Sequence, residues 1–262
     1  MTFAQPGRDD TATPDRGGDP DGDGVEAVLQ QMRARLGSLP AGQEKRGVFL
    51  GTYLRTTAAV GAALRDSRFE DPEWVERWDV VFAQLYLSAH DAAMSGRAAP
   101  RPWRLAFEAP DQLHDLVHVL LGINAHVNYY LPQALLAVIS VEDFEDPVLL
   151  ARRSRDHERI DGVLGSRVAA EDGELGPGSV VDRVLTPLNR LASRRFLTEA
   201  RRKVWHNTQE LHQARLAGPE DYQARLAELE VLSAAKIVDL LRPGQVLLRL
   251  AVAGFGVTLP PP

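Results

Sequence analysis

The chain has no cysteine among its 262 residues. Disulfides, thiolate metal sites and cysteine nucleophiles are therefore excluded. The sequence also has no phosphate-binding glycine loop, no nucleophile elbow and no dinucleotide-binding fingerprint, so nothing in it supports the enzyme classes that depend on those motifs. Alternation of apolar and polar residues, which would indicate strands, is missing outside the last segment.

The first 24 residues have little that could form a core. They contain six Asp and two Arg among Gly, Pro and Thr, which is the composition of a solvated, disordered tail. They lack the basic start and apolar stretch of a signal peptide, so we expect a cytoplasmic protein. Because this acidic tail carries most of the formal net charge of −6, the remainder is nearly neutral, which argues against a dedicated nucleic-acid binder.

The remaining residues, 25–262, are predicted to form one domain of helices. Hydrophobic residues make up 44% of the chain, and a chain of this length can bury a sizeable core without disulfides. Apolar residues recur at helical spacing, and Pro or Gly marks most of the breaks. The predicted helices are Val25–Leu36, Gly47–Asp66, Asp71–Ser95, Pro102–Glu108, Asp111–Leu131, Pro132–Val141, Pro147–Ala170, Val180–Leu216 and Gly218–Leu241, and Gln245–Leu259 fits helix or strand. The predicted fold class is an all-α, single-domain helical bundle.

One long segment, Leu116–Val141, has no Asp, Glu, Lys or Arg. It is long enough to span a membrane, which takes about 20 residues. However, two His, two Asn and a Pro interrupt it, and such groups are costly in lipid. We therefore predict that Asp111–Leu131 is the buried central helix of a bundle, and we expect no membrane span.

The predicted central helix has two different faces when successive residues are turned by about 100°. One face is apolar and consists of Leu113, Leu116, Val117, Leu120, Ile123 and Val127. The other has neutral polar and small residues, namely His114, His118, Gly122, Ala125 and His126, with Asn128 beside them and Asn124 at the border. Buried polar groups need partners, and small residues leave room for a neighbouring helix or a ligand. We interpret this face as one wall of a polar pocket; the alternative is a hydrogen-bond network that fixes helix register.

The polar face offers groups for acid–base chemistry. Histidine exchanges protons near neutral pH, and asparagine can orient a substrate or hold a developing negative charge. We assign His118 and His126 as acid and base, and Asn124 and Asn128 as orienting groups. Tyr86, on the preceding helix, is expected to assist. The predicted function is an enzyme that acts on a small, largely apolar metabolite as a hydrolase, isomerase or cyclase.

The run from His118 to Asn128, HVLLGINAHVN, resembles the signature of the bacterial domain-of-unknown-function family numbered 5995. Residues 69–83, which begin FEDPEW, and residues 200–205 are similar to the family's early and late blocks. The likeness covers roughly residues 47–216. It implies a helical fold with a pocket and brings no established activity; specialised bacterial metabolism is the setting we expect.

The resemblance also marks individual positions. Its characteristic residues are His118, Asn124, His126 and Asn128. It also marks Asp79 and Arg201 as possible partners of these residues. The candidates for substrate binding are His114, Asp79, Arg201 and Tyr130. Tyr130 departs from the family, which usually has Asp there. If that Asp is a ligand or a base, this chain lacks it.

Two His-Asp pairs, His90-Asp91 and His114-Asp115, support a second interpretation. Helical metal-dependent phosphohydrolases of the HD type hold a divalent metal with a His, a later His-Asp pair and a distant Asp. The metal ligands would then be His90, His114, Asp115 and His118, with Asp156 or Asp161 as the distant ligand. The second pair also lies in a stretch with the carboxylate-x-x-His spacing of di-iron bundles.

A third interpretation is a non-catalytic binding or scaffold protein whose His/Asn network is purely structural. In that view His157 and Asp161, four residues apart, form a surface pair, and the arginines from Arg190 to Arg202 form a solvated face. The sequence requires no cofactor and allows a divalent metal. We expect a small-molecule ligand and no nucleic acid, and the oligomeric state, substrate and reaction stay open.

Overall fold

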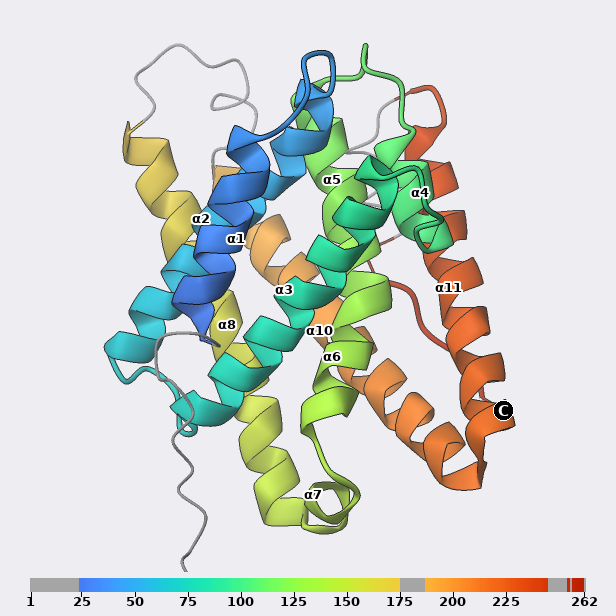
Figure 1. Ribbon diagram of the computed structural model, residues 1–262. Helices are drawn as coiled ribbons and strands as arrows, with labels where there is room; N and C mark the ends of the chain where they lie inside the picture. Colours follow the sequence, from blue (N-terminus) through green and yellow to red (C-terminus); the bar gives the residue numbers. More distant parts are fainter. Residues whose placement is uncertain (1–23, 175–186, 245–253, 255, 262) are drawn as a thin grey trace, which may run out of the picture.

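A computed structural model describes residues 24–174, 187–244, 254 and 256–261. All regular elements in these ranges are helices (Figure 1), so the predicted all-α class is confirmed. They are α1 (Val25–Gly37), α2 (Glu44–Arg65), α3 (Pro72–Met94), α4 (Arg101–Phe107), α5 (Asp115–Ala125), the π-helical turn η1 (His126–Tyr130), α6 (Leu131–Val138), α7 (Val141–Glu145), α8 (Pro147–Glu174), α10 (Pro187–Ala217) and α11 (Pro219–Leu241). Most of the predicted acidic tail lies outside the described residues.

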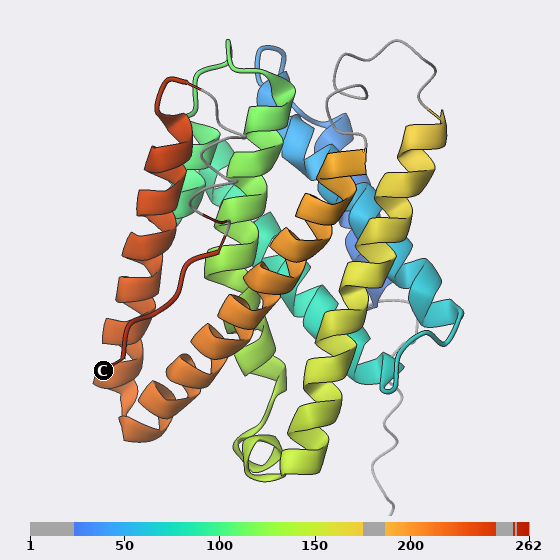
Figure 2. The ribbon, with the colours of Figure 1, turned by 180° about the vertical axis from the view of Figure 1, so that it is seen from behind.

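The helices α5, η1 and α6 follow one another through the middle of the bundle (Figures 1 and 2). Helices α2 and α3 pack against them from one side, and α10 and α11 pack from the other. Within the described residues, no helix combines the length and apolarity needed to cross a bilayer. The charge-free segment is therefore the central part of a helical core, as predicted.

The start of the central helix differs from the prediction. Helix α5 begins at Asp115, not at Asp111. His114 is its N-cap residue, and the His114 Nδ1 accepts a hydrogen bond from the Leu116 N–H at 3.1 Å. This bond satisfies one of the unpaired amides of the first turn, so the imidazole ends the preceding turn and begins the helix.

The middle of the central helix widens into the π turn η1, which ends two residues before Pro132. Pro132 has no N–H to donate to the carbonyl of Asn128, its partner in a regular α-helix. Gln133 provides a further bond, since its side chain donates to the Tyr129 carbonyl at 2.6 Å. Such π turns are rare in helices and occur often at functional sites. The sequence predicted that a new helix begins at Pro132, and the structure places the irregular turn just before this residue.

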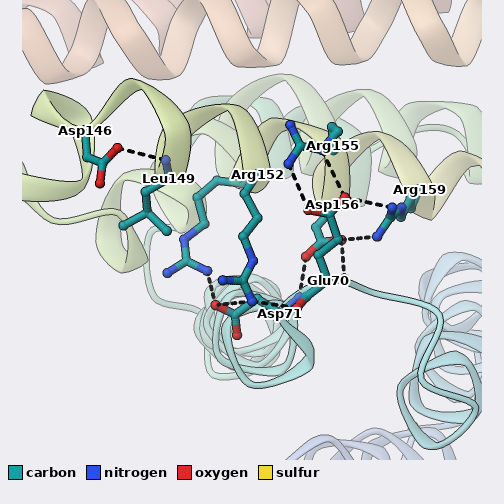
Figure 3. Close-up of polar contacts among 9 residues, drawn as sticks. Glu70, Asp71, Asp146, Leu149, Arg152, Arg155, Asp156 and Arg159 are labelled. Carbon is teal, nitrogen blue, oxygen red and sulfur yellow. Dashed lines mark hydrogen bonds and ion pairs between the residues drawn. The ribbon is translucent and has the colours of Figure 1, made fainter.

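The turn before α3 is fastened to α8 by a network of carboxylates and arginines (Figure 3). The fully buried Asp156 carboxylate accepts bonds from the backbone N–H groups of Glu70 and Asp71 at 2.8 and 2.7 Å. Arg155 binds both Glu70 oxygens at 2.9 Å, and Arg159 binds Glu70 at 2.8 Å. Asp156 was a candidate for the distant metal ligand, but its oxygens hold the two helices together.

The last described residues, 256–261, form neither helix nor strand, so the prediction for residues 245–259 is wrong in its described part. They lie across α10, where the Asn207 side chain forms hydrogen bonds to their backbone, as a neighbouring strand would do. Its side chain donates to the Val257 carbonyl at 3.0 Å and accepts from the Leu259 N–H at 2.8 Å. These bonds leave the Leu259 side chain buried in the core.

Candidate functional site

The polar face of the central helix points into the core. The four side chains that carry the family resemblance are all buried: His118, Asn124, His126 and Asn128. The apolar residues Val117, Leu120 and Ile123 are only half-buried. The helix therefore presents imidazoles and carboxamides to its neighbours, the reverse of an ordinary amphipathic helix.

The two asparagines form a ladder along the helix. Asn124 donates to the Leu120 carbonyl at 2.8 Å, and its oxygen accepts from the Asn128 side chain at 3.1 Å. An amide side chain that forms a hydrogen bond to its own helix is held in place by that helix. The ladder leads into the π turn, so both residues help to hold the irregular backbone there.

His126 is surrounded by aromatic rings. Its ring stacks on Phe82 with centroids 3.5 Å apart and planes 4° apart, and Tyr53 meets it edge-on at 4.4 Å. Four further rings lie 5.8–6.3 Å away, those of Phe49, Tyr86, Trp103 and Tyr130. Neither His126 ring nitrogen has a hydrogen-bond partner among the described residues. Burial holds the His126 pKa well below its usual value, so the imidazole is neutral at pH 7.

Gly122 does not leave open space beside His126. A Cβ at this position would lie 2.3 Å from the Phe49 ring, closer than atoms can approach. The glycine therefore lets α2 pack closely on α5, and of the two possibilities for this small residue, a neighbouring helix or a ligand, the neighbouring helix occupies the space. Phe49 in turn supports the rings around His126.

Asp79 is a buried ionisable group whose charge acts on Tyr53, a ring that contacts His126. Its side chain is buried on α3, and Oδ2 has no partner in the described part of the chain. Burial, and then repulsion from the Glu76 carboxylate, raises the pKa of Asp79 to about 7. Burial raises the pKa of Tyr53 as well, and the nearby Asp79 charge adds to that shift. A carboxyl group that titrates near neutrality suits acid–base chemistry.

Two tyrosines complete this region. Tyr53 on α2 and Tyr86 on α3 have ring centroids 5.7 Å apart. Both are buried, and neither hydroxyl has a partner at hydrogen-bond geometry among the described residues, although the Thr57 hydroxyl lies close to that of Tyr53. We call these residues the His126 cluster: Tyr53, Thr57, Asp79, Tyr86 and His126. Each buried polar atom without a partner costs about 1–3 kcal/mol, so such a concentration calls for an explanation.

His118 lies apart from the His126 cluster. It is two helical turns from His126, about 12 Å along the axis at 1.5 Å per residue. Burial, and then the charge of Lys45, lowers the pKa of His118. The assigned acid and base therefore lie about two turns apart on the central helix, and their joint action stays a prediction.

The four residues of the metal interpretation do not converge. His114 and Asp115 are exposed, and Asp115 forms an ion pair with Lys45 at 2.6 Å. His90 is buried, with its Nδ1 3.4 Å from the adjacent Asp91. Across the described ranges, no three His, Asp or Glu side chains are grouped as a metal site. The other candidate for the distant ligand, the Asp161 side chain, lies outside the described side chains.

The remaining substrate-binding candidates divide between two places. Tyr130 is buried, with its ring centroid 6.3 Å from that of His126. Arg201 is buried on α10, where its charge adds to the effect of burial in lowering the pKa of His157. His157 itself is only 1% exposed, so the predicted surface position is wrong. The reason is that α10 covers this side of α8.

Sequence reasoning missed the residues that α2 contributes to the site. Phe49, Tyr53 and Thr57 recur every four residues, so they form one stripe on that helix. The stripe was visible as helical periodicity, but nothing in one sequence indicates that α2 faces His126. A helix stripe of aromatic and hydroxyl residues is the sequence signal that could have identified α2 as part of the site.

The fold and the site define an all-α protein whose core encloses a neutral imidazole, a carboxyl group that titrates near pH 7 and two phenols. A family model described as a family of unknown function, DUF5995, matches residues 25–243. The chain therefore belongs to this family, and the resemblance seen in the sequence is confirmed. No curated protein and no solved structure matches the chain.

Proposed function

We propose that this protein is an enzyme that performs acid–base chemistry on a small, largely apolar metabolite at the His126 cluster. The observation that carries the proposal is the gathering, in one aromatic region, of buried polar atoms without partners on Tyr53, Asp79, Tyr86 and His126. A ligand with one polar group would satisfy these atoms, and the rings would bind its apolar part.

The groups differ in the roles they can take. Asp79 is half ionised near pH 7, so it can both accept and return a proton. His126 is neutral, so one ring nitrogen can donate a hydrogen bond without carrying charge. The phenols of Tyr53 and Tyr86 keep their protons because burial raises both pKa values.

Proton transfer at a carbon beside a carbonyl is the reaction that best suits this set. The Asp79 carboxylate would take the proton from carbon while the electron pair moves onto the carbonyl oxygen. Hydrogen bonds from Tyr53, Tyr86 or His126 would stabilise the oxygen as it gains charge. Return of the proton to a different carbon gives an isomerisation, one of the reaction types predicted from the sequence.

The test uses the full chain and a panel of small cyclic ketones in deuterated water. Native mass spectrometry identifies any ketone that binds, and mass spectrometry of that ketone measures deuterium uptake. Asp79→Asn is expected to slow uptake by about 10²–10⁴-fold while the ketone still binds. Asp115→Asn, an exposed aspartate outside the cluster, is the matched control and should exchange at the wild-type rate. Equal uptake in both variants, or no ketone bound by the wild type, would refute the proposal.

A non-catalytic role is the second candidate, and the asparagine ladder favours it. Asn124 and Asn128 bond to the helix and to one another, which is what a network that fixes register requires. Ketone binding without any deuterium uptake by the wild type would favour this candidate over the enzyme.

A further inference from the structure

Helices α8 and α10 pack side by side (Figure 2), and a hollow of about 390 Å³ lies between residues of both. Its lining includes Ser154, His157 and Glu158 from α8, and Thr198, Trp205 and Gln209 from α10. The volume lies within the range of small-molecule sites, at its lower end. We call this hollow the α8/α10 groove.

The groove is separate from the His126 cluster. The Trp78 ring lies between the two, with its centroid 6.3 Å from that of His157 and 6.1 Å from that of Phe82. Phe82 in turn is the ring on which His126 stacks. A ligand in the groove therefore belongs to a second site, which does not depend on the reaction proposed above.

His157 gives the groove an unsatisfied polar atom. Its side chain is 1% exposed, and the Nε2 has no hydrogen-bond partner in the described part of the chain. Burial, and then the Arg201 charge, holds the pKa of His157 well below its usual value, so the ring is neutral at pH 7. A nitrogen of a neutral imidazole donates or accepts a hydrogen bond, depending on which nitrogen has the proton. A hydroxyl group can do both, so a ligand hydroxyl matches the Nε2 in either form.

Trp205 gives the groove a flat apolar wall. Its ring is half-buried, and its centroid lies 5.7 Å from that of His157 with 29° between the two planes. A group that bonds to the Nε2 lies close to the plane of the imidazole. An aromatic ring attached to that group is then nearly parallel to the indole. Stacking on the indole favours an aromatic ring over an aliphatic ring of the same size.

The charges around the groove favour neither an anion nor a cation. Arg202 and Glu158 also line the hollow, and both are exposed, one of each sign. The buried Arg201 is part of the lining as well, but it interacts within the chain. We therefore assign it no part in binding, and the groove suits a neutral ligand.

We propose that the α8/α10 groove binds a small neutral phenol. The phenol hydroxyl forms a hydrogen bond with the His157 Nε2, and the aromatic ring stacks on Trp205. The hydroxyl satisfies a buried atom that otherwise has no partner in the described part of the chain. The ring covers the half-buried indole.

The probes are phenol and three compounds of similar size, each titrated into the isotope-labelled full chain. Toluene has a methyl group in place of the hydroxyl, cyclohexanol has the hydroxyl on a ring that is not flat, and benzoate is an anion. Nuclear magnetic resonance follows the Trp205 indole N–H and the His157 ring signals.

Phenol is expected to shift both sets of signals and to bind at least about tenfold more tightly than toluene, because toluene leaves the imidazole nitrogen unpaired. Cyclohexanol should also bind more weakly than phenol, since it cannot stack. Toluene or cyclohexanol binding as tightly as phenol, benzoate binding more tightly than phenol, or no shift at millimolar phenol would each overturn the proposal.

Two variants test the two halves of the site. His157→Phe keeps a ring but removes the nitrogen, so phenol should bind it no more tightly than toluene does. Trp205→Leu should weaken phenol about tenfold through loss of the stacking wall. Tyr222→Leu, which changes a half-buried aromatic residue of α11 outside the groove, is the matched control and should leave phenol binding unchanged.

A third variant distinguishes the groove from the His126 cluster. Asp79→Asn should bind phenol as the wild type does, whereas weaker binding in this variant would place phenol in the cluster and refute the groove. Unchanged phenol binding in His157→Phe or in Trp205→Leu would refute the proposed contacts. If His157→Phe does not fold, the comparison of phenol with toluene on the wild type still tests the hydrogen bond.

Discussion

The buried carboxyl of Asp79 should make the stability of this protein fall as pH rises from acid to neutral. Its pKa is about 7 in the folded chain, against an ordinary value of 3.8. Between these two values the folded protein keeps the proton and the unfolded chain has lost it. The free energy of unfolding then decreases with pH, because the folded state binds more protons.

The magnitude follows from the size of the shift. A rise from 3.8 to about 7 corresponds to roughly 4 kcal/mol at about 1.4 kcal/mol per unit. This contribution favours the folded state fully below pH 4, is lost progressively between pH 4 and 7, and is absent above. Asp79→Asn has a similar shape but does not titrate. The variant should therefore gain stability relative to the wild type as pH rises, by roughly 4 kcal/mol in total.

Urea unfolding of both proteins at several values between pH 4.5 and pH 8 measures this difference directly, since contributions from all other groups cancel. Asp115→Asn, at an exposed aspartate, should show almost no change of the difference with pH. A flat difference for Asp79→Asn would mean that Asp79 ionises at its ordinary pKa. A variant that loses stability relative to the wild type as pH rises would mean that Asp79 is ionised and paired.

Three further outcomes follow from the packing. Gly122→Ala should destabilise the protein by about 1–3 kcal/mol because the added methyl group overlaps Phe49. Gly162→Ala, whose Cβ meets nothing within 4 Å, should stabilise the protein by about 0.5–1 kcal/mol. The denaturant midpoints of the two variants test both values. Tyr86→Phe removes a buried hydroxyl that has no partner within the described residues and should raise stability by about 1–2 kcal/mol, with a higher melting temperature; a loss of stability would show that the hydroxyl is bonded. Asn207→Ala should cost about 2–3 kcal/mol through two lost bonds to backbone and speed hydrogen exchange in the carboxy-terminal segment.

The parts of the fold that depend on local chemistry could be predicted. Asp71 followed by Pro72 predicted the start of α3, where the Asp71 side chain accepts from the Trp74 N–H at 3.1 Å. The absence of charge in the central segment predicted that its polar face is buried, because an exposed face would have had charged residues. Both features depend on residues close together in the chain.

The parts of the fold that depend on contacts between residues far apart in the chain could not be predicted from the sequence. His157 was expected at the surface because its own helix gives no sign that α10 covers it. The shifted pKa of Asp79 arises mainly from burial, and one sequence does not reveal which helices meet. The pairing of His118 with His126 stays a prediction. Both lie on one helix face, and eight residues of helix separate them.

The π turn η1 also fixes how the central helix can be altered. An extra residue is accommodated there, so the inward-facing positions before and after it are out of phase by about 100°. Deleting one residue within 126–130 would restore a regular helix and rotate everything on one side of the turn away from its present neighbours. Related chains that lack the extra residue would therefore present a different set of side chains to α3, even where the flanking sequence is the same.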